Sequence, residues 1–132
     1  GPTEVIAPWG ELLTTAGVAR GATGCVTDGL VRDVRQIRAM GFPVFHGGIG
    51  PLDTKGRARM VEMDGAVTCG GVQVRTGDVV FGDVDGVVVV PYENAVEVID
   101  RARAKIRSED HTREALAEGR LLRDVFAQYG VL

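Results

Sequence analysis

Glycine residues divide this chain into short segments. They account for 19 of the 132 residues, about twice the usual share, and they are scattered along the whole length. Because glycine adopts backbone conformations that other residues avoid, this spacing is typical of many tight turns between short strands. With 45% apolar residues, the chain also has enough material for a packed core. We therefore predict one small globular domain over residues 1–132.

Four stretches have the apolar spacing of helices. In the stretch from Glu11 to Arg20, apolar residues such as Leu12 and Leu13 recur at helical intervals before a glycine. A brief second helix is predicted from Val34 to Met40. An amphipathic helix is predicted from Glu93 to about Glu118, and a last short one from Leu121 to Tyr129. We expect this C-terminal helical segment to dock on a sheet or on a neighbouring subunit.

The segments between these helices have the composition of strands, being short, rich in apolar residues and bounded by Gly or Asp. The predicted strands cover Thr23–Thr27, Pro43–His46, Arg59–Met63, Val72–Arg75, Val79–Gly82 and Gly86–Val90. Short strands with flanking helices predict an α/β fold.

Composition argues against several functional classes. The net charge of −3 and the pI near 5.3 disfavour a nucleic-acid partner, which needs a clustered basic face. The longest apolar run, Val87 to Pro91, is far too short to cross a membrane. Cys25 and Cys69 lie far apart, without the spacing of a zinc site, so we expect two reduced thiols. A cytoplasmic location is the expectation.

The segment from Thr27 to Asp33 contains the strongest candidate for a site. Arg32 and Asp33 follow a turn at Asp28-Gly29, and twenty residues separate Arg32 from Glu11. An arginine grips a carboxylate through two parallel hydrogen bonds, and an aspartate can anchor a hard divalent cation. This pairing suits a small 2-oxo acid.

These residues also have simpler interpretations. Adjacent opposite charges such as Arg32-Asp33 are commonly solvated surface residues, and Glu11 is suited to stabilise a helix dipole from the first turn. His46 is more consistent with a structural role than with phosphate transfer. Asp83 and Asp85 lack the further ligands of a calcium loop, so we interpret them as turn residues.

Several ordered motifs together resemble the RraA-like proteins over essentially the whole chain. The matching motifs are Trp9-Gly10-Glu11-Leu12-Leu13, Asp28-Gly29-Leu30-Val31-Arg32-Asp33, Gly70-Gly71-Val72-Gln73-Val74, Gly77-Asp78, and Asp83-Val84-Asp85-Gly86 running into Val87 to Pro91. The resemblance implies a swivelling β/β/α domain. It also implies a homotrimer or hexamer with sites between subunits, and a further N-terminal region that is absent from this chain or supplied by a separate N-terminal chain.

The resemblance further implies a metal-dependent aldolase and decarboxylase. Such enzymes release pyruvate, through its enolate, from a 4-hydroxy-2-oxo dicarboxylic acid or from oxaloacetate. The family's pattern of acid, twenty residues, Arg-Asp, two residues and acid is met by Glu11, Arg32 and Asp33, whereas Gln36 replaces the last acid. Asp33 would then ligate Mg²⁺ or Mn²⁺, with weaker metal affinity or water activation because Gln36 carries no charge.

The remaining roles also follow from the resemblance. Arg32 would bind the substrate carboxylate, and the backbone amides of Gly10, Glu11, Leu12 and Leu13 would cradle it at a helix N-terminus. Glu11 would orient water as a proton shuttle, and Lys55 would reach a distal carboxylate. Glu109 or Glu114 of a neighbouring subunit would complete the site. The family's other branch, a regulator of ribonuclease activity that works by protein contact, is the alternative function.

Overall fold

The computed structural model describes residues 5–131. The chain forms two compact units, one ending at Val89 and the other beginning at Val90. Each unit is described separately below. This division does not decide how many parts fold independently, so the single domain over residues 1–132 stays a prediction.

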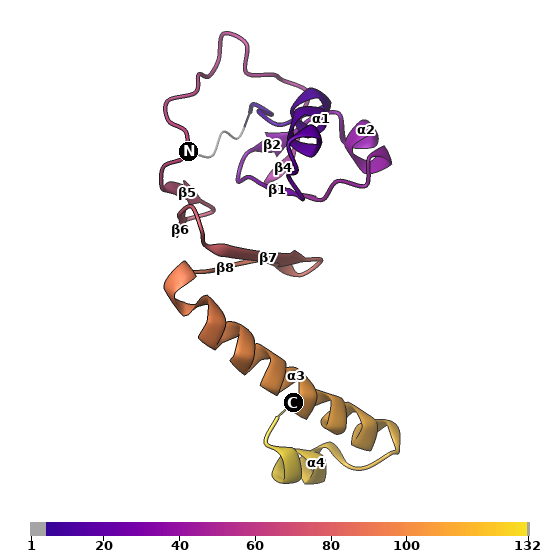
Figure 1. Ribbon diagram of the computed structural model, residues 1–132. Coiled ribbons are helices and arrows are strands. Elements are labelled where there is room, and N and C mark those ends of the chain that lie inside the picture. The colour runs from indigo at the N-terminus through magenta and orange to yellow at the C-terminus, as the bar shows by residue number, and fades with distance from the viewer. Residues whose placement is uncertain (1–4, 132) are drawn as a thin grey trace. The chain divides into compact units, whose positions relative to one another are not determined.

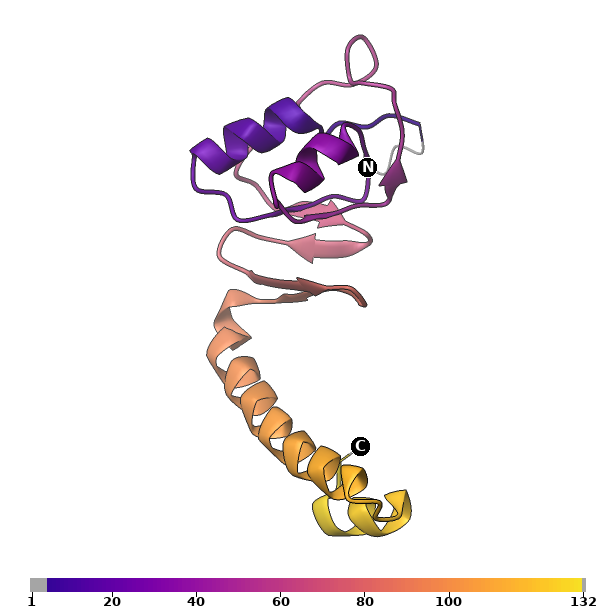
Figure 2. The same ribbon diagram turned by 90° about the vertical axis from the view of Figure 1, so that its right-hand side faces the viewer.

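The first unit begins with helices and very short parallel strands (Figures 1 and 2). Helix α1 spans Glu11–Ala19 and helix α2 spans Val34–Ala39. Strand β1 (Cys25–Val26) pairs in parallel with β3 (Val44–Phe45), and β2 (Leu30–Val31) with β4 (Gly48–Ile49). A further parallel bridge joins Trp9 to Val31.

Two hairpins follow in the same unit. Strand β5 (Val67–Cys69) pairs antiparallel with β6 (Val72–Val74). The intervening Gly70 and Gly71 both have positive φ, as a tight primed turn between antiparallel strands requires. Strand β7 (Val79–Asp83) pairs with β8 (Gly86–Val90). The two hairpins lie beside each other in both views (Figures 1 and 2).

The core of the first unit lies between its two helices and the parallel strand pairs. Its buried apolar side chains are Ile6, Ala7, Val31, Ile37 and Phe42. The rings of Trp9 and Phe42 stack with centroids 6.3 Å apart, which joins the segment before α1 to the loop after α2. This packing holds the residues ahead of α1 against the strand β2.

The second unit is helical. A 3₁₀ turn (Tyr92–Asn94) leads into the long helix α3 (Ala95–Ala117), against which the short helix α4 (Leu122–Tyr129) packs. Val125 of α4 and Ala115 of α3 are buried. Gly130 ends α4 in the left-handed conformation typical of a helix C-terminus. No helix within residues 5–131 combines the length and the apolar character needed to cross a membrane.

Most of the predicted elements are confirmed, but one is wrong. No strand forms from Arg59 to Met63, and Met60, Val61 and Met63 are exposed there. This segment mixes apolar and charged residues and pairs with no other strand in the described part of the chain. Strands β2, β4 and β5 were not predicted. The first two are only two residues long, too short to establish a period of two.

Gly47 is required by close contact between two loops. A Cβ atom at this position would lie 2.4 Å from the carbonyl oxygen of Asp28. The Gly47 N–H donates to the carbonyl of Gly29 over 3.0 Å, so the backbone has little freedom to retreat.

We expect Gly47→Ala to lower the free energy of unfolding by about 1–3 kcal/mol, because the overpacked loops must separate. Urea denaturation followed by circular dichroism measures this change. Gly17→Ala in α1 is the matched control, since its Cβ meets the nearest atom at 3.5 Å. Equal stability of the two variants would contradict the prediction.

Candidate functional site

Arg32 and Asp33 lie where strand β2 ends and helix α2 begins. The backbone N–H of Arg32 donates to the carbonyl of Trp9 over 3.0 Å, which continues the bridge between Trp9 and Val31. Asp33 occupies the N-cap position of α2 in the left-handed conformation, with φ of 57°, and its side chain makes no capping hydrogen bond to α2. That conformation is uncommon for a residue other than glycine, although Asp tolerates it. The backbone thus places both side chains next to the start of α1.

The carboxylate of Asp33 meets the N-terminus of α1. Its Oδ2 atom accepts a hydrogen bond of 3.1 Å from the backbone N–H of Glu11, and it lies 3.7 Å from Nε of Arg32. The side chains of Arg32 and Asp33 are 26% and 40% exposed. A carboxylate at a helix N-terminus is favourable because it pairs with an N–H that has no acceptor within the helix. Asp33 therefore also has a structural role.

Gly10 permits this approach. A Cβ atom at Gly10 would lie 2.7 Å from Oδ2 of Asp33 and 3.0 Å from Cγ of Arg32. The carbonyl of Gly10 accepts a hydrogen bond from the buried Thr14 hydroxyl over 3.0 Å. That hydroxyl in turn accepts one of 2.8 Å from Nε1 of Trp9. The start of α1 is therefore fixed from two sides, and only glycine leaves room for both charged side chains.

The guanidinium of Arg32 is anchored on its other side. Its Nη1 atom donates to the carbonyl of Ala7, a buried residue whose own N–H donates to Leu52 over 2.7 Å. A guanidinium carries five N–H donors in a fixed plane, so this contact orients the group while leaving others for a ligand.

The other predicted site residues of the first unit are Glu11, Gln36 and Lys55. The Glu11 carboxylate is turned along its own helix, where Oε1 accepts a hydrogen bond of 3.1 Å from the Thr15 hydroxyl. Gln36 is exposed on α2. Lys55 is exposed, and its backbone N–H donates to Asp53 over 3.1 Å.

Glu109 and Glu114 belong to the second unit. Glu109 lies 3.3 Å from the ammonium of Lys105, and Glu114 lies 3.9 Å from Nδ1 of His111. Glu109 is thus paired within α3, and Glu114 lies near a histidine of the same helix. Their assignment to a neighbouring subunit's site stays a prediction.

The donor set at this point suits only some metals. Within residues 5–131 no three His, Cys, Asp or Glu side chains gather to hold an ion by themselves. Mg²⁺ is commonly bound through one or two carboxylates and several waters, so the partly exposed Asp33 carboxylate fits a magnesium-type ion.

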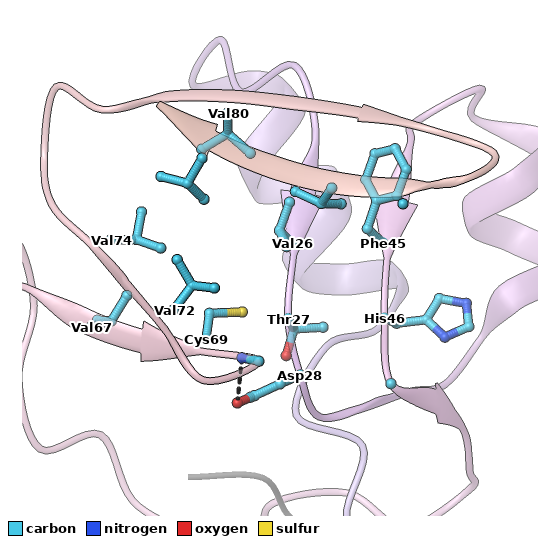
Figure 3. Close-up of a pocket in the computed structure, with 15 residues that line it drawn as sticks. Val26, Thr27, Asp28, Phe45, His46, Val67, Cys69, Val72, Val74 and Val80 are labelled. Carbon is cyan, nitrogen blue, oxygen red and sulfur yellow. Dashed lines mark hydrogen bonds between the residues drawn. The ribbon is translucent and has the colours of Figure 1, made fainter. Parts of the chain in front are cut away.

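A pocket lined mainly by apolar side chains lies elsewhere in the first unit (Figure 3). It has a volume of about 510 Å³. Its lining consists mainly of Val side chains with Phe45 and Cys69, and His46, Thr27 and Asp28 are at its edge. Among the described residues that line it, Glu11, Arg32 and Asp33 do not appear. Sequence reasoning missed this pocket, although the consecutive valines from Val87 to Val90 were a signal, since such runs are typical of strands buried on both faces.

Two polar groups of this pocket are engaged within the fold. Asp28 Oδ2 accepts a hydrogen bond of 3.2 Å from the backbone N–H of Gly70, shown by the dashed line in Figure 3. The Thr27 hydroxyl accepts one of 3.0 Å from the Gly29 N–H. Burial, and secondly the nearby Cys69 thiol, raises the pKa of Cys25 to about 11. The Cys25 thiol is therefore a poor nucleophile at neutral pH.

Comparison with known proteins finds relatives that match most of this chain. An uncharacterized protein of Methanocaldococcus jannaschii is 40% identical over 119 residues, which are 90% of this chain and 57% of that protein. A Halalkalibacterium halodurans protein with the provisional name of 4-hydroxy-4-methyl-2-oxoglutarate aldolase is 33% identical over 105 residues, 80% of this chain and 49% of that protein. This chain thus spans about half the length of these relatives.

A solved structure supports the fold. Streptomyces coelicolor RraAS2, described as an unusual member of the RNase ES inhibitor RraA protein family, matches with a TM-score of 0.77 and 31% identity. The match covers 85% of this chain and 57% of that one. The predicted α/β fold of RraA-like type is confirmed by this likeness. The RraA-like family model, described as Aldolase/RraA, matches residues 1–89. The chain belongs to the RraA-like family.

Proposed function

We propose that this chain forms part of a divalent-metal-dependent carbon–carbon lyase that releases pyruvate from a 4-hydroxy-2-oxo dicarboxylic acid or from oxaloacetate. One observation supports this proposal above the others. The Arg32 guanidinium, the Asp33 carboxylate and the first turn of α1 meet at one place, which Gly10 keeps open. The aldolase name of the H. halodurans relative agrees with it.

Arg32 is assigned to the carboxylate next to the 2-oxo group of the substrate. Its anchored guanidinium presents paired N–H donors that match the two oxygens of a carboxylate. The N–H groups of Leu12 and Leu13, in the first turn of α1, have no acceptor within their helix. Together with the helix dipole, they add favourable sites for the same anion.

The chemistry requires stabilisation of developing negative charge. Cleavage of the bond between C3 and C4 leaves the electron pair on the pyruvate half, whose 2-oxo oxygen becomes the enolate oxygen. The 4-hydroxyl group loses its proton and becomes the carbonyl of the second product. With oxaloacetate, CO₂ leaves instead. Arg32 lies close enough to Asp33 to place its positive charge beside such an oxyanion.

Asp33 is assigned to hold the cation, Mg²⁺ or Mn²⁺. When bound, the ion supplies positive charge that lowers the energy of the developing oxyanion. We assign Glu11 to a water molecule that carries the proton, since its carboxylate is near the surface at the head of α1. Gln36, where the family pattern has an acid, contributes hydrogen bonds without charge.

We also propose that the chain works as a homotrimer or hexamer. Val96 and Ile106 on α3 are exposed apolar side chains, as expected for a helix that packs against a neighbouring subunit. Such packing would place Glu109 or Glu114 of a neighbour at the site.

A second candidate is a non-catalytic regulator of the ribonuclease-inhibitor type. Its support is the likeness to the S. coelicolor protein, together with the uncharged Gln36. If this candidate is correct, the chain should bind a specific protein partner, and Arg32→Ala should leave that binding unchanged. Metal-dependent turnover should then be absent.

The lyase proposal predicts metal binding and pyruvate release that both depend on Asp33. Binding to the chain should weaken the electron paramagnetic resonance signal of free Mn²⁺. Asp33→Asn, in which Asn tolerates the left-handed backbone, should leave that signal at full strength. Coupled pyruvate detection with oxaloacetate or 4-hydroxy-4-methyl-2-oxoglutarate and Mg²⁺ should show turnover that a chelator removes.

Arg32→Lys should reduce kcat/KM by about 10²-fold, since a bidentate contact is lost.

Asp124→Asn in α4 is the matched control for removal of a carboxylate, and it should leave Mn²⁺ binding unchanged. If the unmodified chain binds no Mn²⁺, or if Asp33→Asn binds it equally well, the assignment of Asp33 is wrong.

Gly10→Ala tests the geometry of the site. The added methyl group must displace Asp33 or Arg32, so we expect the variant to lose most of its Mn²⁺ binding and pyruvate release while remaining folded. Gly17→Ala, in the same helix, has room for its methyl group and should behave like the unmodified chain. Comparable activity of both variants would show that the close approach at Gly10 is irrelevant to function.

A further inference from the structure

We propose that a small pocket between helix α2 and strand β3 binds a short aliphatic carboxylate. Arg38 and His46 would hold the acid group, and the hydrocarbon part would lie against an apolar floor. The pocket has a volume of about 120 Å³. This proposal does not rest on the lyase function.

The floor of this pocket is apolar. Val31, Ile37 and Phe42, which are all buried, line it together with the half-buried Val44. Such a surface favours contact with a hydrocarbon group, because the contact removes apolar area from water. An ion that is hydrated on all sides, such as phosphate, would instead lose hydration against this floor without a compensating hydrogen bond. The floor therefore favours an acid that carries an apolar tail.

Two side chains that can hold an acid group lie at the edge of the pocket. Arg38, in the last turn of α2, and His46, just after β3, both line it, and both residues are exposed. Figure 3 shows the His46 ring directed away from the valine side chains of the other pocket. A guanidinium matches the two oxygens of a carboxylate, and an imidazole ring donates a further N–H. Among the described lining residues there is no Asp or Glu, so an anion meets no like charge in the lining.

The donors of these two side chains are free for a ligand. Within residues 5–131, neither Arg38 nor His46 has a side-chain hydrogen bond or an ion pair. Arg57 shows the contrast, since its guanidinium is paired with the Asp53 carboxylate at 2.9 Å. A bound carboxylate would therefore add contacts at Arg38 without breaking others.

The volume limits the size of the ligand. The share of one water molecule in the liquid is about 30 Å³, so a pocket of about 120 Å³ has the room of roughly four water molecules. Pockets for drug-sized ligands begin at about 300 Å³. An acid with a short chain, such as propionate, fits this limit.

The pocket is separate from the candidate site at Arg32 and Asp33. Val31 and Val34 flank those two residues in the chain and line the pocket, whereas neither Arg32 nor Asp33 is among its described lining residues. The Asp33 carboxylate instead binds a backbone N–H at the start of α1. Variants can therefore distinguish a carboxylate bound in this pocket from one bound by Arg32.

Nuclear magnetic resonance of the histidine rings tests the proposal, because the chain has two histidines. Sodium propionate is added to the 132-residue chain at constant pH and ionic strength, and His46→Gln assigns the signals. We expect propionate to shift the His46 signals to saturation with a dissociation constant of about 1 mM. The His111 signals should stay unchanged. Propionamide, which has the same shape without the charge, and phosphate, which has charge without a tail, should each bind at least about tenfold more weakly.

Three variants locate the contact. Arg38→Ala should weaken propionate binding at least about tenfold, because the bidentate contact is lost. Arg35→Ala is the matched control, since it removes the same charge from an exposed position of α2 that does not line the pocket. It should bind propionate normally. Arg32→Ala should also leave the shift of the His46 signals unchanged, so this result is independent of the lyase assignment.

Two kinds of outcome would overturn the proposal. If propionate leaves the His46 signals unmoved, or moves them equally in Arg38→Ala, the pocket is not a carboxylate site. Arg38 would then act only as a positive charge near a helix C-terminus, where it is favourable without any ligand. If phosphate or propionamide binds as well as propionate, the combination of an acid group with an apolar tail is not what the pocket recognises.

Discussion

The close approach of two backbone segments, Trp9 to Glu11 and Val31 to Asp33, is the contact on which the first unit depends. Trp9 and Val31 pair as in a parallel sheet, and the Arg32 N–H donates to the Trp9 carbonyl. Gly10 lies between them without a side chain, so the Asp33 carboxylate can reach the first N–H of α1. The same contact starts one helix, ends one strand and begins a second helix. A displacement there would disturb all three elements.

At this contact, the same groups have a structural role and a proposed chemical role. Asp33 stabilises α1 because a carboxylate at a helix N-terminus satisfies an N–H that the helix leaves unpaired. The same property, positive potential at the start of α1, favours a carboxylate ligand. Arg32 is oriented by the buried carbonyl of Ala7 and adds a second positive charge. Under the proposed function, this corner would bind an anion, and the neighbouring Asp33 carboxylate would hold a hard cation.

The elements that depend on a local sequence pattern could be predicted. The elements that depend on pairing between distant segments could not. The spacing of Leu12 and Leu13 and the run from Gly86 to Val90 predicted α1 and β8, because period and turn residues are local properties. The two-residue strand β2 exists because Trp9 and Gly48 pair with it, which no local pattern records. Arg32 and Asp33 were predicted as site residues from their motif, and that assignment stays a prediction. Their contact with Gly10 depends on a left-handed Asp33 that composition does not reveal.

In the β7–β8 hairpin of the same unit, the exposure of the side chains differs from what the sequence predicts. Valines at successive positions, as in β8, are typical of strands with packing partners on both faces. Here Val88 is exposed, and Val87 and Val89 line an open pocket. Uncovered apolar surface lowers stability and favours association. The contact between Trp9 and Val31–Asp33 is held by backbone pairing and a backbone hydrogen bond, whereas the β7–β8 hairpin keeps apolar side chains exposed. The first unit therefore joins a corner in which charged side chains are held by backbone contacts to a hairpin whose apolar side chains are exposed.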